Sequence, residues 1–420
     1  MMRLFHHLKK YAHWYLLGYV FILSWVLALH NIPLYHYKHG FDGAGHVDYM
    51  TYIVNNGQLP AAELGWETHQ SPIYYWIGAG LISLFGTWKA AQYINIFILW
   101  ITIGVAIYGL RIIFPNKLEA VLIGAVSLAA LPMLNIFPVM VTNELMNTMW
   151  SLAVLVFLLK ILKTTDEKKY FWNSFFVTVF FVLGYWTKVS IIMISSLIAG
   201  VYIYKIFKGE IPRLRQFILG ALMLVAVLAA CYPVYMRASQ SVGPSNLALV
   251  ASSKLVKRPL DFYVRLDWIP KVDMYTTQYY SLLGGAWNSF FNDGHNVLTP
   301  FIAFHKKAFI LWSLGFVLFP LSLYGLYRLT KKDRVYGLFS WAVGLAMIAV
   351  FIYYNTRSGH YSAVRLTYET PIVLAYAIGI ASAFNSSKLK ALIYMCLCIQ
   401  MTIMASFYWI LPWWHVTKGF

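Results

Sequence analysis

The stretch that decides the fold of this chain reads PIYYWIGAGLISLFGTWKAAQYINIFILWITIGVAIYGLRI, residues 72–112. It holds two apolar pieces, residues 72–86 and residues 91–112. A helix needs about 20 apolar residues to cross the hydrocarbon core of a bilayer. Only the second piece is long enough, so the stretch predicts one membrane span with a shorter apolar helix before it.

The composition of the whole chain also indicates a lipid environment. Of its 420 residues, 60% are hydrophobic and 11% are charged, whereas about a quarter of the residues in a soluble domain are charged. Its 31 Tyr and 16 Trp are residues that favour the headgroup layer. The three cysteines lie in apolar runs and indicate neither a disulfide framework nor a zinc site. We expect a single integral membrane domain, residues 1–420.

The formal net charge of +18 does not indicate a nucleic-acid partner. The basic residues lie in clusters between apolar segments, which is the arrangement that orients a membrane protein. Six clusters in short loops hold 19 of the 33 basic residues and are expected on the cytoplasmic side. They are Arg3/Lys9/Lys10, Arg111/Lys117, Lys160/Lys163/Lys168/Lys169, Lys205/Lys208/Arg213/Arg215, Arg328/Lys331/Lys332/Arg334 and Lys388/Lys390.

Eleven spans follow from the apolar runs. We expect them at residues 14–33, 91–112, 118–134, 143–162, 170–186, 189–206, 216–233, 307–327, 335–354, 370–384 and 391–411. The amino terminus then lies in the cytoplasm and the carboxyl terminus outside, as in a multi-pass protein of the cell membrane. No cleavable signal pattern precedes the first span.

A parity argument assigns the short apolar piece. Residue 35 is expected outside and Arg111 inside, so the chain between them crosses an odd number of times. Residues 72–86 are therefore predicted to form a helix in the outer interface, with a second interfacial helix at about Ala44 to Asn56. The outer loops at 35–90 and 235–306 are long, and long structured loops on one face usually carry function.

Asp42 is the candidate catalytic residue of the first outer loop. It lies in GFDGAG, residues 40–45, directly before the predicted helix. A carboxylate held there can accept a proton from an incoming hydroxyl, which is the work of a general base. Asp is also a favoured helix cap, and the sequence alone weighs the two interpretations equally.

His46 and Asp48 follow Asp42, and Glu67 and His69 come later in the same loop. A histidine that packs in the interface is the simpler interpretation of His46. His46, Glu67 and His69 also suit a divalent metal ion or an acceptor, although their spacing matches no specific metal motif. The sequence identifies no cofactor beyond that open alternative.

Basic residues recur at the outer ends of the expected spans. Lys188 follows Thr187 at a break in a long apolar stretch, where a charge is costly unless it has a partner. A phosphate group is a natural partner for Lys and Arg. We interpret Lys188 and Arg365 as phosphate ligands, and Arg357 and His360 as further candidates. Lipid headgroups are the expected partners of the cations in the long outer loop, namely Arg237, Lys254, Lys257, Arg258, Arg265 and Lys271.

Taken together, these features resemble the membrane glycosyltransferases of the GT-C class, the group that contains protein O-mannosyltransferases and the lipid A aminoarabinose transferase. The matching pieces cover nearly the whole chain in order, spacing and sidedness. They are Asp42 with His46 and Tyr49 before GQLP (57–60), HQSPIYY (69–75) ending in LFG (84–86), Asn143-Glu144, Thr187-Lys188, and the Arg365 loop ending at Pro371.

The resemblance implies a GT-C-like fold with two interfacial helices in the first outer loop. It implies a polyprenyl-phosphate sugar as donor, a lipid, polysaccharide or protein as acceptor, and inversion at the anomeric carbon. Members of the class often carry an Asp-Glu pair in this loop. Here the pair reads Asp42-Gly43, so Asp48 or Glu144 would supply the second acidic group.

Two other function classes fit part of the pattern. A transporter or flippase for a lipid-linked sugar explains the spans and the outer cations, but it predicts charges near mid-membrane and repeat symmetry, which the sequence lacks. An oligosaccharide polymerase or ligase fits the arginines of the long outer loop but not the Asp42 pattern. The identities of the sugar and the acceptor stay open.

Overall fold

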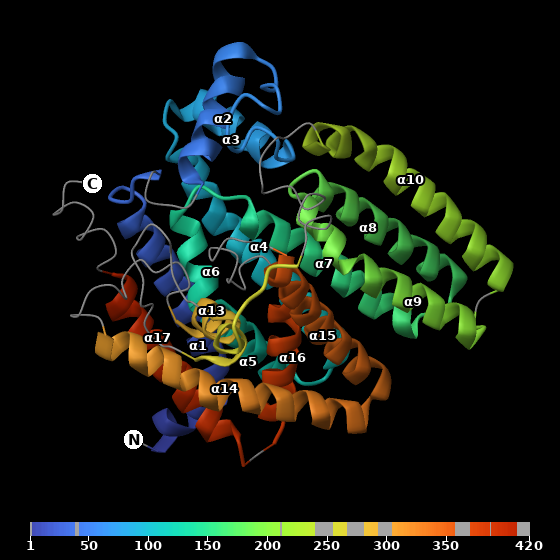
Figure 1. Cartoon of the computed structure of the whole chain (residues 1–420). Helices are drawn as coiled ribbons and strands as arrows, with labels where there is room; N and C mark the ends of the chain where they lie inside the picture. Colours follow the sequence, from blue (N-terminus) through green and yellow to red (C-terminus); the bar gives the residue numbers. More distant parts are fainter. Residues whose placement is uncertain are drawn as a thin grey trace.

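The computed structural model describes residues 2–37, 42–210, 212–239, 255–266, 281–292, 305–357, 370–386 and 388–409, and its regular structure there is helical throughout (Figure 1). The helices are α1 (Met2–Asn31), α2 (Gly43–Asn56), α3 (Ile73–Phe85), α4 (Ala90–Ile113), α5 (Leu118–Ala129), α6 (Pro132–Ile136), η2 (Phe137–Val139), α7 (Glu144–Lys163), α8 (Glu167–Tyr185), η3 (Val189–Ile194), α9 (Ser195–Lys208), α10 (Arg213–Ser239), α12 (Leu260–Val264), α13 (Leu282–Phe291), α14 (His305–Lys332), α15 (Arg334–Arg357), α16 (Ile372–Phe384) and α17 (Lys390–Tyr408).

The expected all-α polytopic membrane architecture is confirmed. In the described part of the chain, seven helices are long and apolar enough to cross a membrane: α1, α4, α7, η3 with α9, α10, α14 and α15. The expected count of eleven is not confirmed. The expected spans in α8, α16 and α17 are helical but fall outside that group, because α8 begins with charged residues and the other two are short.

A bend replaces one straight span. Residues 118–134 were expected to form a single helix, but α5 ends at Ala129, and α6 with η2 leaves at an angle of 61°. Pro132 is the first residue of α6. Proline lacks the amide hydrogen of a helix interior and disfavours helical geometry in the residue before it. The pair counts as an eighth span only if both halves form one crossing.

The centre of the molecule is formed by α7 and α16. Every residue of α16 except Ile372 is buried, which is the pattern of a helix surrounded by other helices. It packs closely against α14. A side chain on Gly379 of α16 would collide with Ser322 of α14, and a side chain on Gly325 of α14 would collide with the backbone of Gly379. Two glycines therefore permit α14 and α16 to approach each other closely.

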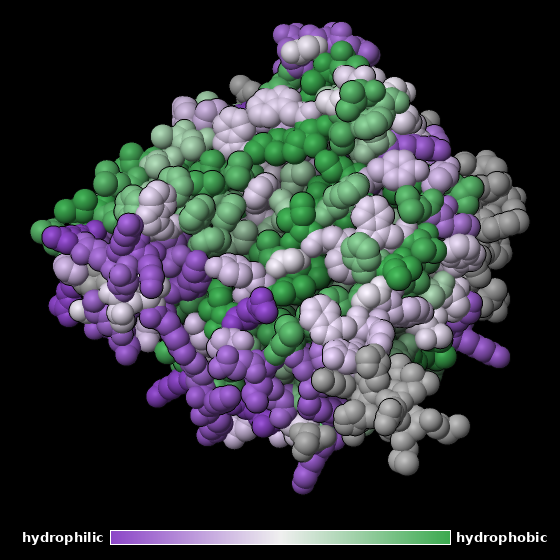
Figure 2. All heavy atoms as spheres, turned by 180° about the vertical axis from the view of Figure 1, so that it is seen from behind, coloured by the Kyte–Doolittle hydropathy of each residue, from purple (hydrophilic) through white to green (hydrophobic). Residues whose placement is uncertain are grey.

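The ion pairs agree with the predicted division of the loops into two sides. Lys163 pairs with Asp333, Arg215 with Glu167, Lys205 with Glu210, and Lys390 with Glu119. All eight residues were assigned to one side, and among the described residues no ion pair joins that side to the other. Figure 2 shows an apolar surface across the middle of one face, with hydrophilic residues gathered along its lower edge.

The two expected interfacial helices are confirmed as helices, α2 and α3. They pack against each other at the end of the molecule opposite the amino terminus (Figure 1). At 13 residues α3 is about 20 Å long, well short of a bilayer core. Met50 of α2 occupies the space beside Gly78 of α3, so the two helices form one unit.

Candidate active site

Asp42 stands directly before α2 with φ of 60°, and it is the only residue other than glycine with positive φ in the described ranges. Its carboxylate makes no capping hydrogen bond. Instead it accepts a hydrogen bond from Nε1 of Trp66 at 2.9 Å, and the residue is exposed. The alternative in which the Asp42 carboxylate is only a helix cap is therefore wrong. The carboxylate points into the loop that follows α2. The positive φ of Asp42 is a strained backbone conformation of the kind found at functional sites.

The loop that carries Trp66 is fixed from outside by Arg237, at the end of α10. The guanidinium donates hydrogen bonds to the carbonyl oxygens of Pro60, at 2.6 Å, and Thr68. It also lies 5.5 Å from the centre of the Tyr49 ring. The sequence interpretation of Arg237 as a headgroup ligand is wrong, because its side chain is occupied inside the protein.

His46 is buried in α2 and lies in an aromatic cluster. Its Nδ1 is 2.7 Å from the hydroxyl of Tyr75, and the Tyr75 ring stacks on Tyr49 at 3.9 Å. Burial lowers the pKa of His46 to about 4, with the nearby Asp42 carboxylate opposing the shift. His46 is therefore neutral at physiological pH, and its simpler interpretation as a packed histidine fits the geometry.

Glu67 lies next to His46, with 3.9 Å between Oε2 and Nδ1. The residue is 3% exposed, and burial, followed by the charge of Asp42, raises its pKa to about 8. Lys188 opposes this shift. At neutral pH Glu67 is mostly protonated, so the site contains a neutral carboxylic acid beside the exposed Asp42.

Lys188 lies at the predicted helix break, in extended backbone between α8 and η3. Its Nζ donates to Glu144 Oε1 at 2.5 Å and to Asn143 Oδ1 at 3.3 Å, both at the start of α7. The amide of Asn143 in turn donates to Oε1 of Gln70 at 3.4 Å. These contacts link the break between α8 and η3, and the start of α7, to the loop that carries Glu67.

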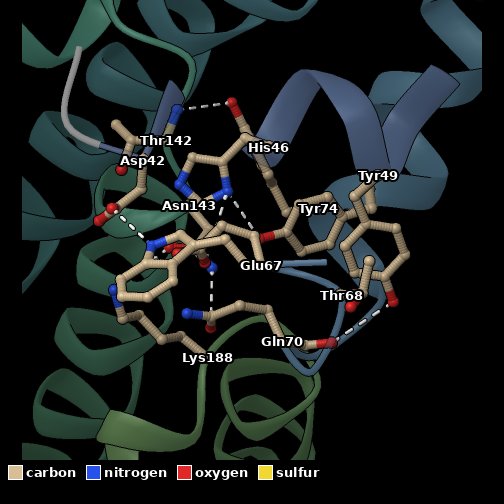
Figure 3. Close-up of polar contacts among 12 residues, drawn as sticks. Asp42, His46, Tyr49, Glu67, Thr68, Gln70, Tyr74, Thr142, Asn143 and Lys188 are labelled. Carbon is tan, nitrogen blue, oxygen red and sulfur yellow. Dashed lines mark hydrogen bonds and ion pairs between the residues drawn. The ribbon is translucent and has the colours of Figure 1, made fainter. Parts of the chain in front are cut away.

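The predicted residues thus meet in one place. Figure 3 shows Asp42, His46, Glu67, Asn143 and Lys188 converging from α2, the following loop, α7 and the α8–η3 break. The charges of Asp42 and Lys188 both act on His46 and Glu67, and also on His69, whose pKa burial lowers. A carboxylate and a cation from distant parts of the sequence therefore share one electrostatic environment.

Other predicted residues are not part of this cluster. Asp48 is exposed on α2 and is not among the charges that act on His46 or Glu67. Arg357 ends α15, with its guanidinium 5.3 Å from the centre of the Tyr353 ring. His360 and Arg365 lie outside the described residues. No three His, Cys, Asp or Glu side chains in the described ranges come close enough to hold a metal ion, so His46, Glu67 and His69 do not form the metal site that the sequence left open.

Sequence reasoning missed Trp66 and Gln70. Trp66 gives no pattern of its own, because an exposed Trp in an outer loop is equally typical of a membrane anchor. Its role depends on a turn that brings residue 66 back to residue 42. Gln70 lies in the HQSP stretch that was noted, but its partner Asn143 is separated from it by 73 residues.

Nearly the whole chain is similar to the solved structures of two proteins. ArnT from Cupriavidus metallidurans in the apo state matches 96% of this chain and 78% of that protein, with 14% sequence identity and a TM-score of 0.59. The same protein bound to undecaprenyl phosphate matches with the same TM-score. The match to an Archaeoglobus fulgidus oligosaccharyltransferase tethered to an acceptor peptide covers 96% of this chain and 55% of the oligosaccharyltransferase chain. The sequence identity is 14% and the TM-score is 0.56.

At these identities the likeness establishes the fold. The GT-C-like architecture expected from the sequence is confirmed by it. No protein-family model matches the chain, and no curated protein matches its sequence.

Proposed function

We propose that this chain is a glycosyltransferase that moves a sugar from a polyprenyl-phosphate-linked donor to an acceptor hydroxyl at the outer face of the membrane. The observation that carries the proposal is the exposed carboxylate of Asp42, which makes no cap bond, is held by Trp66 and acts on Glu67 together with the Lys188 cation. The fold supports it, because ArnT of the same fold has been solved with undecaprenyl phosphate bound.

Asp42 is the general base in this proposal. The hydrogen bond from Trp66 fixes the direction of one carboxylate oxygen, and the exposure of the residue leaves the carboxylate open to an acceptor hydroxyl. The carboxylate takes the hydroxyl proton as that oxygen attacks the anomeric carbon and the bond to the phosphate breaks. A single displacement of this kind inverts the configuration at that carbon.

Lys188 is the first phosphate ligand. It is 15% exposed at its side chain and lies beside Asn143 and Glu144 at the start of α7. As the sugar leaves, negative charge grows on the phosphate, and a fixed cation in a partly buried site stabilises that charge more than water does. The Glu144 carboxylate holds the lysine in position between turnovers.

The charge balance of the cluster calls for another cation. Asp42 and Glu144 together outweigh Lys188 in formal charge, and Glu67 is mostly neutral at pH 7. A phosphate brought into this environment therefore needs more positive charge than Lys188 supplies. Arg357, His360 and Arg365 are the proposed sources. The described chain resumes at Thr370, whose Oγ1 is 2.5 Å from that of Thr148, one turn beyond Glu144 on α7.

The competing transporter function receives less support from this arrangement. A transporter for an anionic lipid needs the cations, but it does not need a carboxylate fixed by an indole in a strained backbone position. The acceptor stays open among a lipid, a polysaccharide and a protein.

The test is sugar transfer by purified protein, with a set of polyprenyl-phosphate sugars as donors. Asp42→Asn keeps the shape of the side chain and its bond to Trp66, so transfer should be lost while thermal stability and binding of undecaprenyl phosphate persist. Asp48→Asn is the matched control, since it removes an exposed carboxylate six residues along on α2 and should leave transfer unchanged. Turnover by Asp42→Asn at the wild-type rate would remove Asp42 from the mechanism.

A further inference from the structure

The indole of Trp66 lies exposed beside the candidate base. Its Nε1 donates a hydrogen bond to Asp42 Oδ1 at 2.9 Å, and the dashed line that ends on the Asp42 carboxylate in Figure 3 marks this bond. Trp66 is nevertheless 58% exposed. The one polar atom of the indole is therefore turned toward the carboxylate, while much of its apolar ring is open to a ligand that has an apolar face of its own.

The loop holds Trp66 firmly on both sides. The next residue, Glu67, packs so closely on α2 that a side chain at Gly45 would collide with it. The buried hydroxyl of Thr68 accepts a hydrogen bond at 2.9 Å from the backbone amide of Gly65, which precedes Trp66. An exposed ring on such a loop loses little conformational freedom when a ligand covers it, which favours binding.

A membrane anchor is the other common role of an exposed Trp in an outer loop. An anchoring Trp places its N–H among the headgroups, whereas the N–H of Trp66 is already bonded to Asp42. Trp76 is the contrasting case, because it is 44% exposed and lies on the short apolar helix α3. Trp76 is therefore suited to the bilayer, and Trp66 to a ligand at Asp42.

The position of the attacking hydroxyl limits what that ligand can be. A hydroxyl that gives its proton to Asp42 lies within hydrogen-bond distance of the carboxylate, and so within reach of the indole bonded to the same group. In a sugar ring the C–H groups form an apolar face and the hydroxyls project from its edge. One sugar ring can therefore place a hydroxyl on Asp42 and its apolar face on Trp66. The hydroxyl of a serine, a threonine or a glycerol lipid has no such face beside it.

The charges around Asp42 favour a neutral acceptor. Lys188 is paired with Glu144 and is the proposed ligand of the donor phosphate. An acceptor phosphate or carboxylate would place a second negative charge beside the Asp42 carboxylate, which raises the free energy unless a further cation compensates it. A neutral sugar carries no such cost.

We propose that the acceptor is a neutral carbohydrate and that the exposed face of Trp66 stacks on the sugar ring that carries the attacking hydroxyl. Trp66 then determines acceptor specificity in addition to fixing Asp42. This inference rests on the proposed function, because it takes Asp42 as the base.

The first experiment measures binding and does not depend on sugar transfer. The full chain is labelled with 5-fluorotryptophan in phospholipid nanodiscs, which carry no sugar, and the fluorine resonance of Trp66 is identified by its loss in Trp66→Phe. The probes are neutral tetrasaccharides of glucose, mannose and N-acetylglucosamine, a threonine peptide and a monoacylglycerol. At least one tetrasaccharide should shift the Trp66 resonance, and the peptide and the monoacylglycerol should not.

Variants separate stacking from the support of Asp42, with saccharide affinity measured by saturation-transfer NMR on the saccharide protons. Trp66→Leu removes the flat ring and should weaken binding by about tenfold, the value of covering one face of an indole. Trp66→Phe keeps a ring but not the N–H, so it should lower the kcat of transfer and keep most of the saccharide affinity. Trp76→Leu is the matched control, since it removes a similarly exposed indole on α3 and should leave saccharide affinity unchanged.

Three results would each overturn the inference. They are no shift of the Trp66 resonance with any tetrasaccharide, unchanged saccharide affinity in Trp66→Leu, and broadening of the Trp66 resonance by spin-labelled lipid as strong as that of Trp76. The first and third use the wild-type chain, so they decide the matter even where Trp66→Leu does not fold. Wild-type transfer by Asp42→Asn contradicts the proposed function, whereas a lack of saccharide binding in a protein that needs Asp42 for transfer contradicts this inference alone.

Discussion

Replacing Glu67 by Gln should change how the stability of the protein depends on pH. The folded protein holds a proton on Glu67 up to about pH 8, whereas the ordinary pKa of a glutamate is 4.5. Between these values the folded state binds more protons at this position than the unfolded state does, so stability falls as pH rises. His46 acts in the opposite sense, because its pKa is lowered from 6.5 to about 4, and its contribution rises with pH in that interval.

The two contributions nearly cancel between pH 4.5 and 6.5, and Glu67 alone acts above pH 6.5. One pH unit is worth about 1.4 kcal/mol per proton, so the wild-type protein should lose roughly 2 kcal/mol between pH 6.5 and pH 8. In Glu67→Gln that loss should disappear. Chemical unfolding in mixed micelles at a series of pH values measures both slopes.

The matched control is Glu63→Gln, which removes an exposed carboxylate from the same loop and should retain the wild-type slope. A Glu67→Gln protein that loses stability above pH 6.5 as the wild-type protein does would refute the assignment of a buried neutral acid. So would a wild-type protein whose stability rises through this range.

Three further predictions concern the surroundings of Asp42. Lys188→Ala should weaken binding of undecaprenyl phosphate by about tenfold or more, as expected for loss of a charge-assisted contact, while the exposed Lys257→Ala should not; calorimetry measures both. Arg237→Ala should lower the free energy of unfolding by roughly 2 kcal/mol, because it removes two charged hydrogen bonds to the loop, and Arg237→Lys should restore part of it. Gly43→Ala should destabilise by roughly 1–3 kcal/mol, since the added carbon meets the backbone carbonyl of Tyr37, while Gly80→Ala meets nothing and should be neutral or slightly stabilising in thermal unfolding.

The sequence predicted the helices of the first outer loop because their signals are local. The length of residues 72–86 and the parity of the charge clusters define α3, and the glycines around Asp42 mark the start of α2. The signal for the helix break at Lys188 is also local, since a charged residue within an apolar run is typical of such a break. The count of spans was less certain, because α16 is surrounded by protein, so its 13 residues need not match the thickness of the bilayer.

The partners in the site could not be predicted in the same way. Glu144 and Lys188 were both named, yet their ion pair depends on how α7 packs against η3, which no spacing in the sequence encodes. Arg237 was assigned to headgroups because it is one of the cations of the long outer loop predicted from the sequence. Its bonds to Pro60 and Thr68 arise from the end of α10 meeting the first loop.

The glycine that follows Asp42 has a physical reason that bears on the proposed chemistry. A side chain at residue 43 would collide with the carbonyl of Tyr37, so this backbone has no room for the second carboxylate of an Asp-Glu pair. The other acidic groups of the cluster come from elsewhere in the chain. They are Glu67, in the loop after α2, and Glu144, in α7; the charges of Asp42 and Glu144 both act on Glu67. Glu144 is paired with Lys188, and Glu67 is mostly protonated at neutral pH. Asp42 is therefore the one carboxylate of the described cluster that is both exposed and without a cationic partner, which is the state a general base needs before the acceptor arrives.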